Sequence, residues 1–313
     1  MIQGIVMALL KVGNSHAHFK DVYGEFESLK KIKDCGFECV DYSLHGYQNL
    51  TLQDYRKDSE NYIFYQDDAQ VKKHFVEVKK YMDDIGLLAE HTHAPYYFFT
   101  PAECFNNEDF VSIYLKAIDA SMYLGAKQIV IHPPRCPDPE NNYKRLFDIA
   151  YKFYSKLQQR AIDNGVEIAI ENMGCYDKVK GRIGMPDVFS SAEKLLNIID
   201  ALGKGFCACL DTGHAYFSGQ DPAHFARLLG DKLKVLHMQD TDGYDDLHIC
   251  PTCGYIDWND FILALAQIDY KGVLNFEVNF HRSGDKNMLA YGQFLSVMGH
   301  NWAQDIEDIK SKK

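Results

Sequence analysis

Residues 126–172 read AKQIVIHPPRCPDPENNYKRLFDIAYKFYSKLQQRAIDNGVEIAIEN and contain two short apolar runs separated by a long amphipathic stretch. The two runs, 126–132 and 166–172, are rich in Val and Ile, as buried parallel strands are. The stretch 143–164 between them has helical periodicity and is followed by Gly165, a residue that suits a helix C-cap. The segment therefore predicts a strand, a crossover helix and a second parallel strand.

The same unit recurs along the chain. Further helical patterns lie at 26–35, 69–85 and 111–124, and a glycine again precedes most of the apolar runs (Gly36, Gly86, Gly125, Gly205 and Gly272). The eight predicted strands are the apolar runs at 4–10, 36–44, 86–93, 126–132, 166–172, 205–211, 233–239 and 272–278.

Eight alternating units predict an α/β fold, a single (β/α)8 TIM barrel domain over residues 1–313. We expect a long loop at about 44–68 and a C-terminal helical segment from about 284. A doubly wound open sheet is the alternative, but the sequence has no G-x-G-x-x-G phosphate turn after the first predicted strand.

The composition excludes several classes of protein. The formal net charge of −11 disfavours a nucleic-acid partner, since nucleic-acid binders usually present a basic face. No apolar stretch approaches the roughly 20 residues that span a bilayer, and the N-terminal apolar run (5–10) has no basic residues before it, unlike a signal peptide. Nine scattered cysteines, an odd number, fit reduced thiols in a cytoplasmic protein.

Polar residues follow six consecutive predicted strands, at the end where a barrel carries its active site. A lone His or Glu at a strand end is more often structural than functional, but six converging on one mouth favour a metal site, because buried charges without partners are costly. These residues are His93, His132, Glu171, Asp211 with His214 after it, His237 with Asp246 and His248 after it, and Glu277.

The expected ligand set is Glu171, Asp211, His237 and Glu277. Three carboxylates and one imidazole suit one divalent ion such as Mn²⁺, Mg²⁺, Co²⁺ or Zn²⁺. The other five, His93, His132, His214, Asp246 and His248, would form an outer ring that binds substrate or additional metal ions.

Four motifs, IAIEN (168–172), CLDTGHAYFSGQDP (209–222), LHMQDTDGYDDLH (236–248) and NFEV (275–278), resemble the xylose isomerase-like TIM barrel superfamily. That superfamily includes sugar-phosphate isomerases and epimerases, ketose 3-epimerases, inosose dehydratases and endonuclease IV. The resemblance covers roughly residues 86–280. It implies that Glu171, Asp211, His237 and Glu277 are the shared metal ligands.

The resemblance also implies a mechanism. Glu171 and Glu277 would act as the acid/base pair, one removing a proton next to the carbonyl of an open-chain sugar and the other returning one through an enediolate. His214 would bind a substrate hydroxyl, and Asp240 and Asp246 would bind further hydroxyls or orient a histidine. The implied activity is that of a sugar, sugar-phosphate or sugar-acid isomerase or epimerase, with small-molecule substrates and a possible homo-oligomer.

Three alternatives stay open. A dehydratase or lyase of the same superfamily would begin with the same proton abstraction. An endonuclease IV-like phosphodiesterase would use up to three Zn²⁺, with His93, His132 and the Asp246/His248 pair as further ligands, but the loop 239–248 has four aspartates and no arginine and is poorly suited to a phosphate backbone. A non-catalytic sugar-binding subunit is disfavoured by the intact Glu171/Glu277 pair.

Three other features have structural interpretations. Cys250 and Cys253 form a C-x-x-C that we interpret as loop thiols, because a structural zinc site would need two more ligands. Cys207 and Cys209 are expected in the core, and Trp258 is expected to pack at the barrel rim.

Overall fold

Eight parallel strands form the centre of the computed structural model, which describes residues 9–45, 62–95, 108–134, 142–175, 188–280 and 284–312. Their order is β7-β6-β5-β4-β3-β2-β1-β8, so β1 to β7 pair with their neighbours in sequence and β8 pairs with β1. The strands are β1 (Val12–Ser15), β2 (Cys39–Ser43), β3 (Leu88–His93), β4 (Gln128–Ile131), β5 (Glu167–Glu171), β6 (Phe206–Asp211), β7 (Leu233–His237) and β8 (Leu274–Phe276).

The two ends of this sheet, β7 and β8, meet and close the ring. Met238, just after β7, donates its N–H to the carbonyl of Asn275 (2.8 Å) and accepts the N–H of Glu277 (3.1 Å). These bonds and one isolated bridge between Met238 and Phe276 are the described backbone pairing across this seam. The ring confirms the predicted (β/α)8 barrel and excludes the doubly wound sheet.

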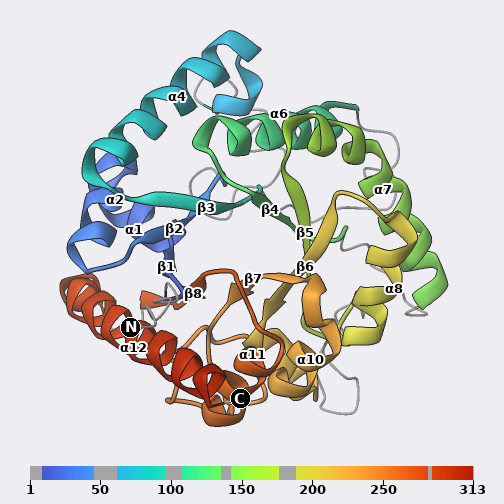
Figure 1. Cartoon of the computed structure of the whole chain (residues 1–313). Helices are drawn as coiled ribbons and strands as arrows, with labels where there is room; N and C mark the ends of the chain where they lie inside the picture. Colours follow the sequence, from blue (N-terminus) through green and yellow to red (C-terminus); the bar gives the residue numbers. More distant parts are fainter. Residues whose placement is uncertain are drawn as a thin grey trace, which may run out of the picture.

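Helices surround the strands (Figure 1). Many begin at a capping side chain, as where Asp67 and Gln70 form a capping box, and α4 and α7 end at Gly86 and Gly165 in the left-handed conformation. They are α1 (Ala17–Tyr23), α2 (Glu25–Asp34), α4 (Asp68–Ile85), α6 (Glu108–Leu124), α7 (Tyr143–Asn164), α8 (Ala192–Leu202), α9 (Thr212–Phe217), α10 (Pro222–Leu229), α11 (Trp258–Gln267) and α12 (Met288–Ser311), with short 3-10 turns η1 (Ile63–Tyr65), η3 (Gly230–Lys232) and η5 (Asp285–Asn287).

Among the described residues, no helix has the length and apolar character needed to cross a membrane. Of the loop expected at about 44–68, residues 46–61 lie outside the described residues.

The prediction of the first strand at 4–10 was wrong. Residues 9 and 10 belong to no strand, residues 4–8 lie outside the described residues, and the first described strand is Val12–Ser15. β1 contains Gly13, where a side-chain carbon would come within 3.0 Å of Asn275 Oδ1 and 3.2 Å of Cys39 Cβ. A strand built around such a close approach has no apolar run, so hydrophobicity did not mark it.

Gly272 was also misinterpreted as a helix cap. The helix before it, α11, ends at Gln267 with Ile268 as its C-cap, and Gly272 does not have a positive φ. A side chain at Gly272 would overlap the backbone carbonyl of Lys234 and the ring of Tyr270. The glycine is required by this close approach to β7.

The interior of the barrel has an apolar half and a polar half. Small buried residues fill it on the side of β4–β7, as expected for the two cysteines of β6: Val130, Ala169, Cys207, Cys209 and Val235. On the other side the buried interior positions include Asp41, His91 and Asn275, with Asp41 and His91 paired in register between β2 and β3. Barrel interiors are usually filled by branched aliphatic side chains, so this polar half needs an explanation.

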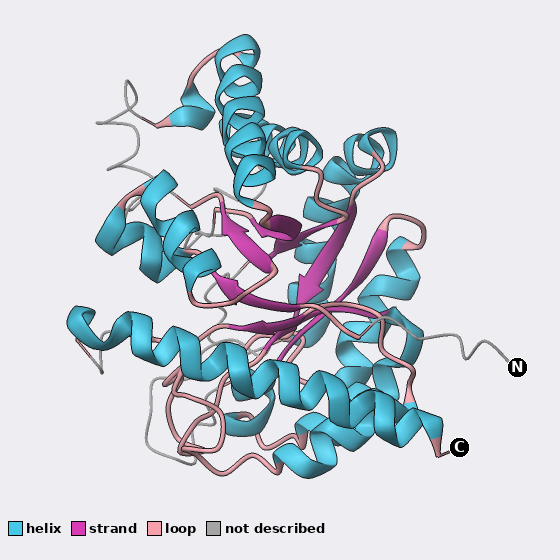
Figure 2. Cartoon of the chain, turned by 60° about the vertical axis from the view of Figure 1, so that its left-hand side comes forward, coloured by secondary structure: helices cyan, strands magenta, loops and turns pink. Residues whose placement is uncertain are grey.

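The last helix, α12, covers the paired strands β1 and β8 (Figure 1; in Figure 2 it runs across the front of the barrel). Its buried Gly299 faces Val12 of β1 and Phe276 of β8. A side chain at this position would overlap Val12 and come within 2.9 Å of a ring carbon of Phe276.

Gly299→Ala should therefore destabilise the protein even though alanine favours helices by about 1 kcal/mol, because overpacking typically costs about 1–3 kcal/mol. Urea unfolding of Gly299→Ala, Val12→Ala and the double variant tests this. In the double variant the smaller Val12 side chain makes room for the new methyl group, so its loss of stability should be less than the sum of the two single losses. Strict additivity would contradict the close packing of α12 on β1.

Candidate metal centre

The four predicted ligands lie together at the carboxyl ends of their strands. Glu171, Asp211 and His237 are the last residues of β5, β6 and β7, and Glu277 directly follows β8. Parallel strands end at the same side of the barrel, which is why residues far apart in sequence meet here.

His237 occupies the middle of this group. Its Nδ1 lies 3.3 Å from Glu171 Oε1 and 3.2 Å from Glu277 Oε2. The side chains of Glu171 and His237 are 1% and 0% exposed, whereas that of Glu277 is 22% exposed. Glu277 is therefore the carboxylate of the pair that faces the mouth of the barrel.

His93 and His132 approach Glu171 from the side of β3 and β4. His132 Nε2 lies 2.9 Å from Glu171 Oε2, and His93 Nε2 lies 3.1 Å from His132 Nε2 and 3.6 Å from Glu171 Oε2. These three side chains have the spacing of a metal site.

His214, Asp246 and His248 form an arm on the opposite side. His214 Nδ1 lies 3.3 Å from Glu171 Oε1, and its Nε2 lies 3.2 Å from Asp246 Oδ2. His248 Nε2 lies 3.0 Å from Asp246 Oδ1, and its Nδ1 is 3.0 Å from the backbone carbonyl oxygen of Glu277. All nine residues predicted for the site are thus brought to one end of the barrel.

Unpartnered polar atoms support a bound cation at this position. Among the described residues, Asp211 Oδ2 and both ring nitrogens of His237 are buried without a hydrogen-bond partner. Buried polar groups normally have partners, and a set of carboxylates around an imidazole is a donor set that divalent ions accept. The residues present therefore fit a divalent metal ion.

A sequence profile of the family described as xylose isomerase-like TIM barrel matches residues 29–298 of the chain. The protein belongs to the xylose isomerase-like TIM barrel family. The predicted resemblance is confirmed.

Two sequence relatives illustrate the range of this family. The uncharacterized protein MJ1311 of Methanocaldococcus jannaschii is 28% identical over 221 residues, which cover 68% of this chain and 72% of the relative. A probable endonuclease 4 of Geobacillus sp. (strain WCH70) is 28% identical over 177 residues, 51% of this chain and 54% of that protein.

Two solved structures share the fold of the family. A D-tagatose 3-epimerase-like protein superposes with a TM-score of 0.69 at 22% identity, covering 97% of this chain and 99% of that one. The IolI protein, crystallised with a zinc atom, gives 0.67 at 15% identity over 97% and 99% of the two chains. Likeness at this identity establishes the fold of this family member and leaves its activity to be argued from the site.

The electrostatics of the site link its acids and its histidines. Burial alone would raise the pKa of Glu171, but His237, His132 and His214 hold that pKa well below its usual value. Burial raises the pKa of Asp211 to about 7. Burial alone would lower the pKa of His237, but the charges of Glu277 and Glu171 help to raise it well above its usual value. Protons on histidines therefore balance the carboxylates when no cation is bound.

Sequence reasoning missed three residues of the site. Asp41 lies 3.5 Å from Nε2 of His237, and His91 lies beside Asp41. Gln239 donates from Nε2 to Asp211 Oδ1 (3.1 Å) and Asp246 Oδ1 (3.3 Å). His91 shares the interior face of β3 with His93 through the two-residue period of a strand, a signal that was present in His91-Thr92-His93.

Asp240 does not face substrate or orient a histidine, contrary to expectation. It is fully buried, and its carboxylate accepts the backbone N–H groups of Thr241, Thr252 and Ile256 and the indole N–H of Trp258. It thereby fixes the loop that carries Asp246 and His248. Trp258 is buried and stacks on Trp302, with ring centroids 5.1 Å apart.

Cys250 and Cys253, the C-x-x-C of this loop, lie at the two ends of a backbone turn, and both thiols are free. Cys253 donates its backbone N–H to the carbonyl of Cys250 (3.0 Å), and of the two thiols only that of Cys253 is exposed. The loop interpretation of these cysteines fits this arrangement.

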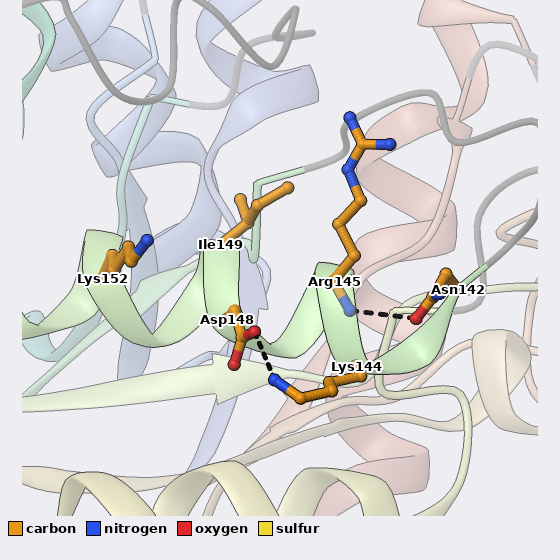
Figure 3. Close-up of a pocket in the computed structure, with 6 residues that line it drawn as sticks. All are labelled: Asn142, Lys144, Arg145, Asp148, Ile149 and Lys152. Carbon is orange, nitrogen blue, oxygen red and sulfur yellow. Dashed lines mark hydrogen bonds and ion pairs between the residues drawn. The ribbon is translucent and has the colours of Figure 1, made fainter.

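The surface depression of Figure 3 is separate from the centre. Its volume is about 320 Å³, and its lining comes from the start of α7 and the residue before it, where Asn142 caps the helix at Arg145 and Lys144 pairs with Asp148 at 2.7 Å. None of the nine predicted site residues lines this depression.

Asp240→Ala should cost roughly 2–4 kcal/mol of stability, because it leaves buried N–H groups without an acceptor. The matched control is Asp242→Ala in the same loop, where a partly exposed carboxylate accepts the N–H groups of Tyr244 and Asp245 and should contribute less than about 1 kcal/mol. Thermal and urea unfolding of both variants measures the difference. Equal losses would contradict the anchoring role of Asp240.

Proposed function

We propose that this family member is a divalent-metal-dependent sugar isomerase or epimerase, acting on a sugar, sugar phosphate or sugar acid. The observation that carries the proposal is the position of His237 Nδ1 between the carboxylates of Glu171 and Glu277, with the unpartnered Asp211 Oδ2 beside them in the described structure. Glu171, Asp211, His237 and Glu277 would hold one ion of Mn, Co, Mg or Zn. The zinc atom of the related IolI structure agrees with such an ion.

Glu171 and Glu277 are the proposed acid and base. They project from β5 and β8, which β6 and β7 separate in the ring, and their carboxylates approach His237 Nδ1 from these two strands, so a substrate bound between them would meet a carboxylate on each face. One carboxylate removes a proton from a carbon next to a carbonyl and the other returns a proton, and proton transfer by a positioned side chain typically contributes about 10²–10⁴-fold. The cation would stabilise the negative charge of the enediolate.

The other residues of the mouth would bind the substrate. His214 lies against Glu171 and Asp246, where its ring can contact a hydroxyl close to the reacting carbon. Hydroxyl-rich substrates match a mouth lined by several imidazoles and carboxylates, which donate and accept hydrogen bonds. A dehydratase or lyase would use the same proton abstraction and differ in the group that leaves afterwards.

Glu277→Gln should abolish turnover while leaving the fold intact, since the amide keeps the shape of the side chain and cannot take up a proton. Incorporation of solvent deuterium next to the carbonyl, followed by NMR over a panel of ketoses, measures the proton transfer. Glu90→Gln is the control, because Glu90 is a partly buried carboxylate paired with Lys11 and Lys127 away from the site. Normal exchange by Glu277→Gln would rule out the proposed pair.

Metal affinity should rise with pH. A cation displaces the protons that His237 and Asp211 otherwise hold, and the pKa of Asp211 lies at about 7. Lowering the pH below 7 should therefore weaken binding about tenfold per unit for each displaced proton. Isothermal titration with Mn²⁺ and Zn²⁺ between pH 6 and 8 measures this, and an affinity independent of pH would contradict the assigned ligands.

A zinc phosphodiesterase of the endonuclease IV type is the second candidate. It is favoured by the clusters His93/His132/Glu171 and Asp211/His214/His248, each with metal-site spacing, and by the endonuclease relative. The acidic loop 239–248 opposes it, because a phosphate backbone would meet Asp242 and Asp245 there. Elemental analysis separates the two: one equivalent of metal supports the isomerase, whereas three of zinc with cleavage of abasic DNA would support the phosphodiesterase.

A further inference from the structure

A buried carboxylate lies beneath the candidate metal centre, in the polar half of the barrel interior. Asp41 of β2 is 1% exposed and lies between two imidazoles: its Oδ2 is 3.5 Å from His237 Nε2, and its Oδ1 is 3.7 Å from His91 Nε2. Both oxygens and both nitrogens are buried and lack a hydrogen-bond partner within the described residues. Neither the proposed acid/base pair nor the ligand set uses Asp41.

We propose that Asp41 is a positioning residue for His237: its carboxylate accepts the Nε2–H of the imidazole and so keeps Nδ1 free for the metal ion. The inference rests on the metal site of the proposed function and adds the residue that selects the coordinating nitrogen.

The need for such a residue follows from the surroundings of His237. A neutral imidazole carries one N–H, and Nδ1 faces the acceptors Glu171 and Glu277, which would attract that proton and block coordination. A carboxylate at Nε2 competes for the proton. Metal-bound histidines commonly donate their second ring N–H to a carboxylate, which orients the ring and raises its basicity.

His91 completes the arrangement on the other oxygen of Asp41. A buried carboxylate is costly unless its oxygens are hydrogen-bonded, and the two imidazoles can supply one N–H each. The two separations of 3.5 and 3.7 Å would shorten by less than 1 Å to reach the usual length of a charge-assisted hydrogen bond. The pair Asp41 and His91 therefore accounts for part of the polar interior.

The competing interpretation is a second cation between Asp41, His91 and His237, which also have metal-site spacing. Two cations would then share one imidazole through its two nitrogens, and His237 would have to lose its only N–H. The positioning role needs no such ionisation, which is why we prefer it.

The first experiment compares metal binding by the full chain carrying Asp41→Asn with wild type, after dialysis against a chelator and titration with Zn²⁺. We expect one equivalent bound by both proteins, with about 10–100-fold lower affinity in the variant. The control is Thr92→Val, since Thr92 is equally buried on β3 but bonds Ser121 of α6 instead of facing the interior, and its affinity should stay within about twofold of wild type. If Asp41→Asn misfolds, His91→Gln leaves the carboxylate in place and should show a smaller loss.

The second measurement reports the hydrogen bond itself. In protein labelled with ¹⁵N-histidine, the His237 Nε2–H proton should resonate far downfield in wild type and move upfield in Asp41→Asn, whereas general loss of stability would leave it in place. In the zinc-loaded wild type, a His237 ring protonated on Nδ1 and not on Nε2 would overturn the inference. Wild-type zinc affinity in folded Asp41→Asn would overturn it too, as would a second equivalent of zinc that disappears in the variant. A wild-type protein that shows the Nε2–H contact but binds no metal would instead contradict the proposed function.

Discussion

The negative charge of Glu171, withdrawn from water at the end of β5, is the constraint around which the mouth of the barrel is organised. An isolated buried carboxylate is too costly for a folded protein unless it is paired or binds a metal. Imidazoles from four other parts of the chain approach it: His93, His132, His214 and His237. The barrel gathers these groups because its strands are parallel and end at one face. Compensating one charge thus produces a cluster that also suits a divalent cation.

The loop after β7 adds two further side chains, Asp246 and His248, to the cluster at the strand ends. Asp240 gathers backbone N–H groups from its own loop, and that loop then presents Asp246 and His248 toward the strands. His248 adopts the left-handed conformation (φ 46°), which is rare for a residue with a side chain, and contacts the backbone of Glu277 and Asn279. Such strain persists where the surrounding contacts fix it, and it is common at functional sites.

The sequence was informative wherever a polar residue ended an apolar run. Strands β2–β8 and the convergence of the nine predicted site residues at one end of the barrel were predictable because buried parallel strands are continuous apolar segments and their ends point to one face. β1 was missed because its sequence, Val-Gly-Asn-Ser, has no apolar run. Gly13 is needed there for close packing against Asn275 and Cys39, and a search for hydrophobic segments does not detect such a requirement. Asp41 and His91 were missed because they lie inside strands, where a lone polar residue resembles an ordinary interruption until the register places the two side by side. Asp240 was misassigned because an aspartate in an acidic loop gives no sign of which backbone groups it will bind.

The seam between β7 and β8 has fewer backbone hydrogen bonds than the other strand pairs of the ring. Elsewhere each described strand pairs with its neighbour over at least three residues in register, whereas this joint depends on the few bonds around Met238. His237 and Glu277 lie on its two sides, so an ion that both residues bind would cross-link β7 and β8 where they share the fewest backbone hydrogen bonds. In the metal-free protein, protection of backbone amides against solvent exchange would then be lowest at this junction. Local opening of the ring would occur next to the residues that bind the ion.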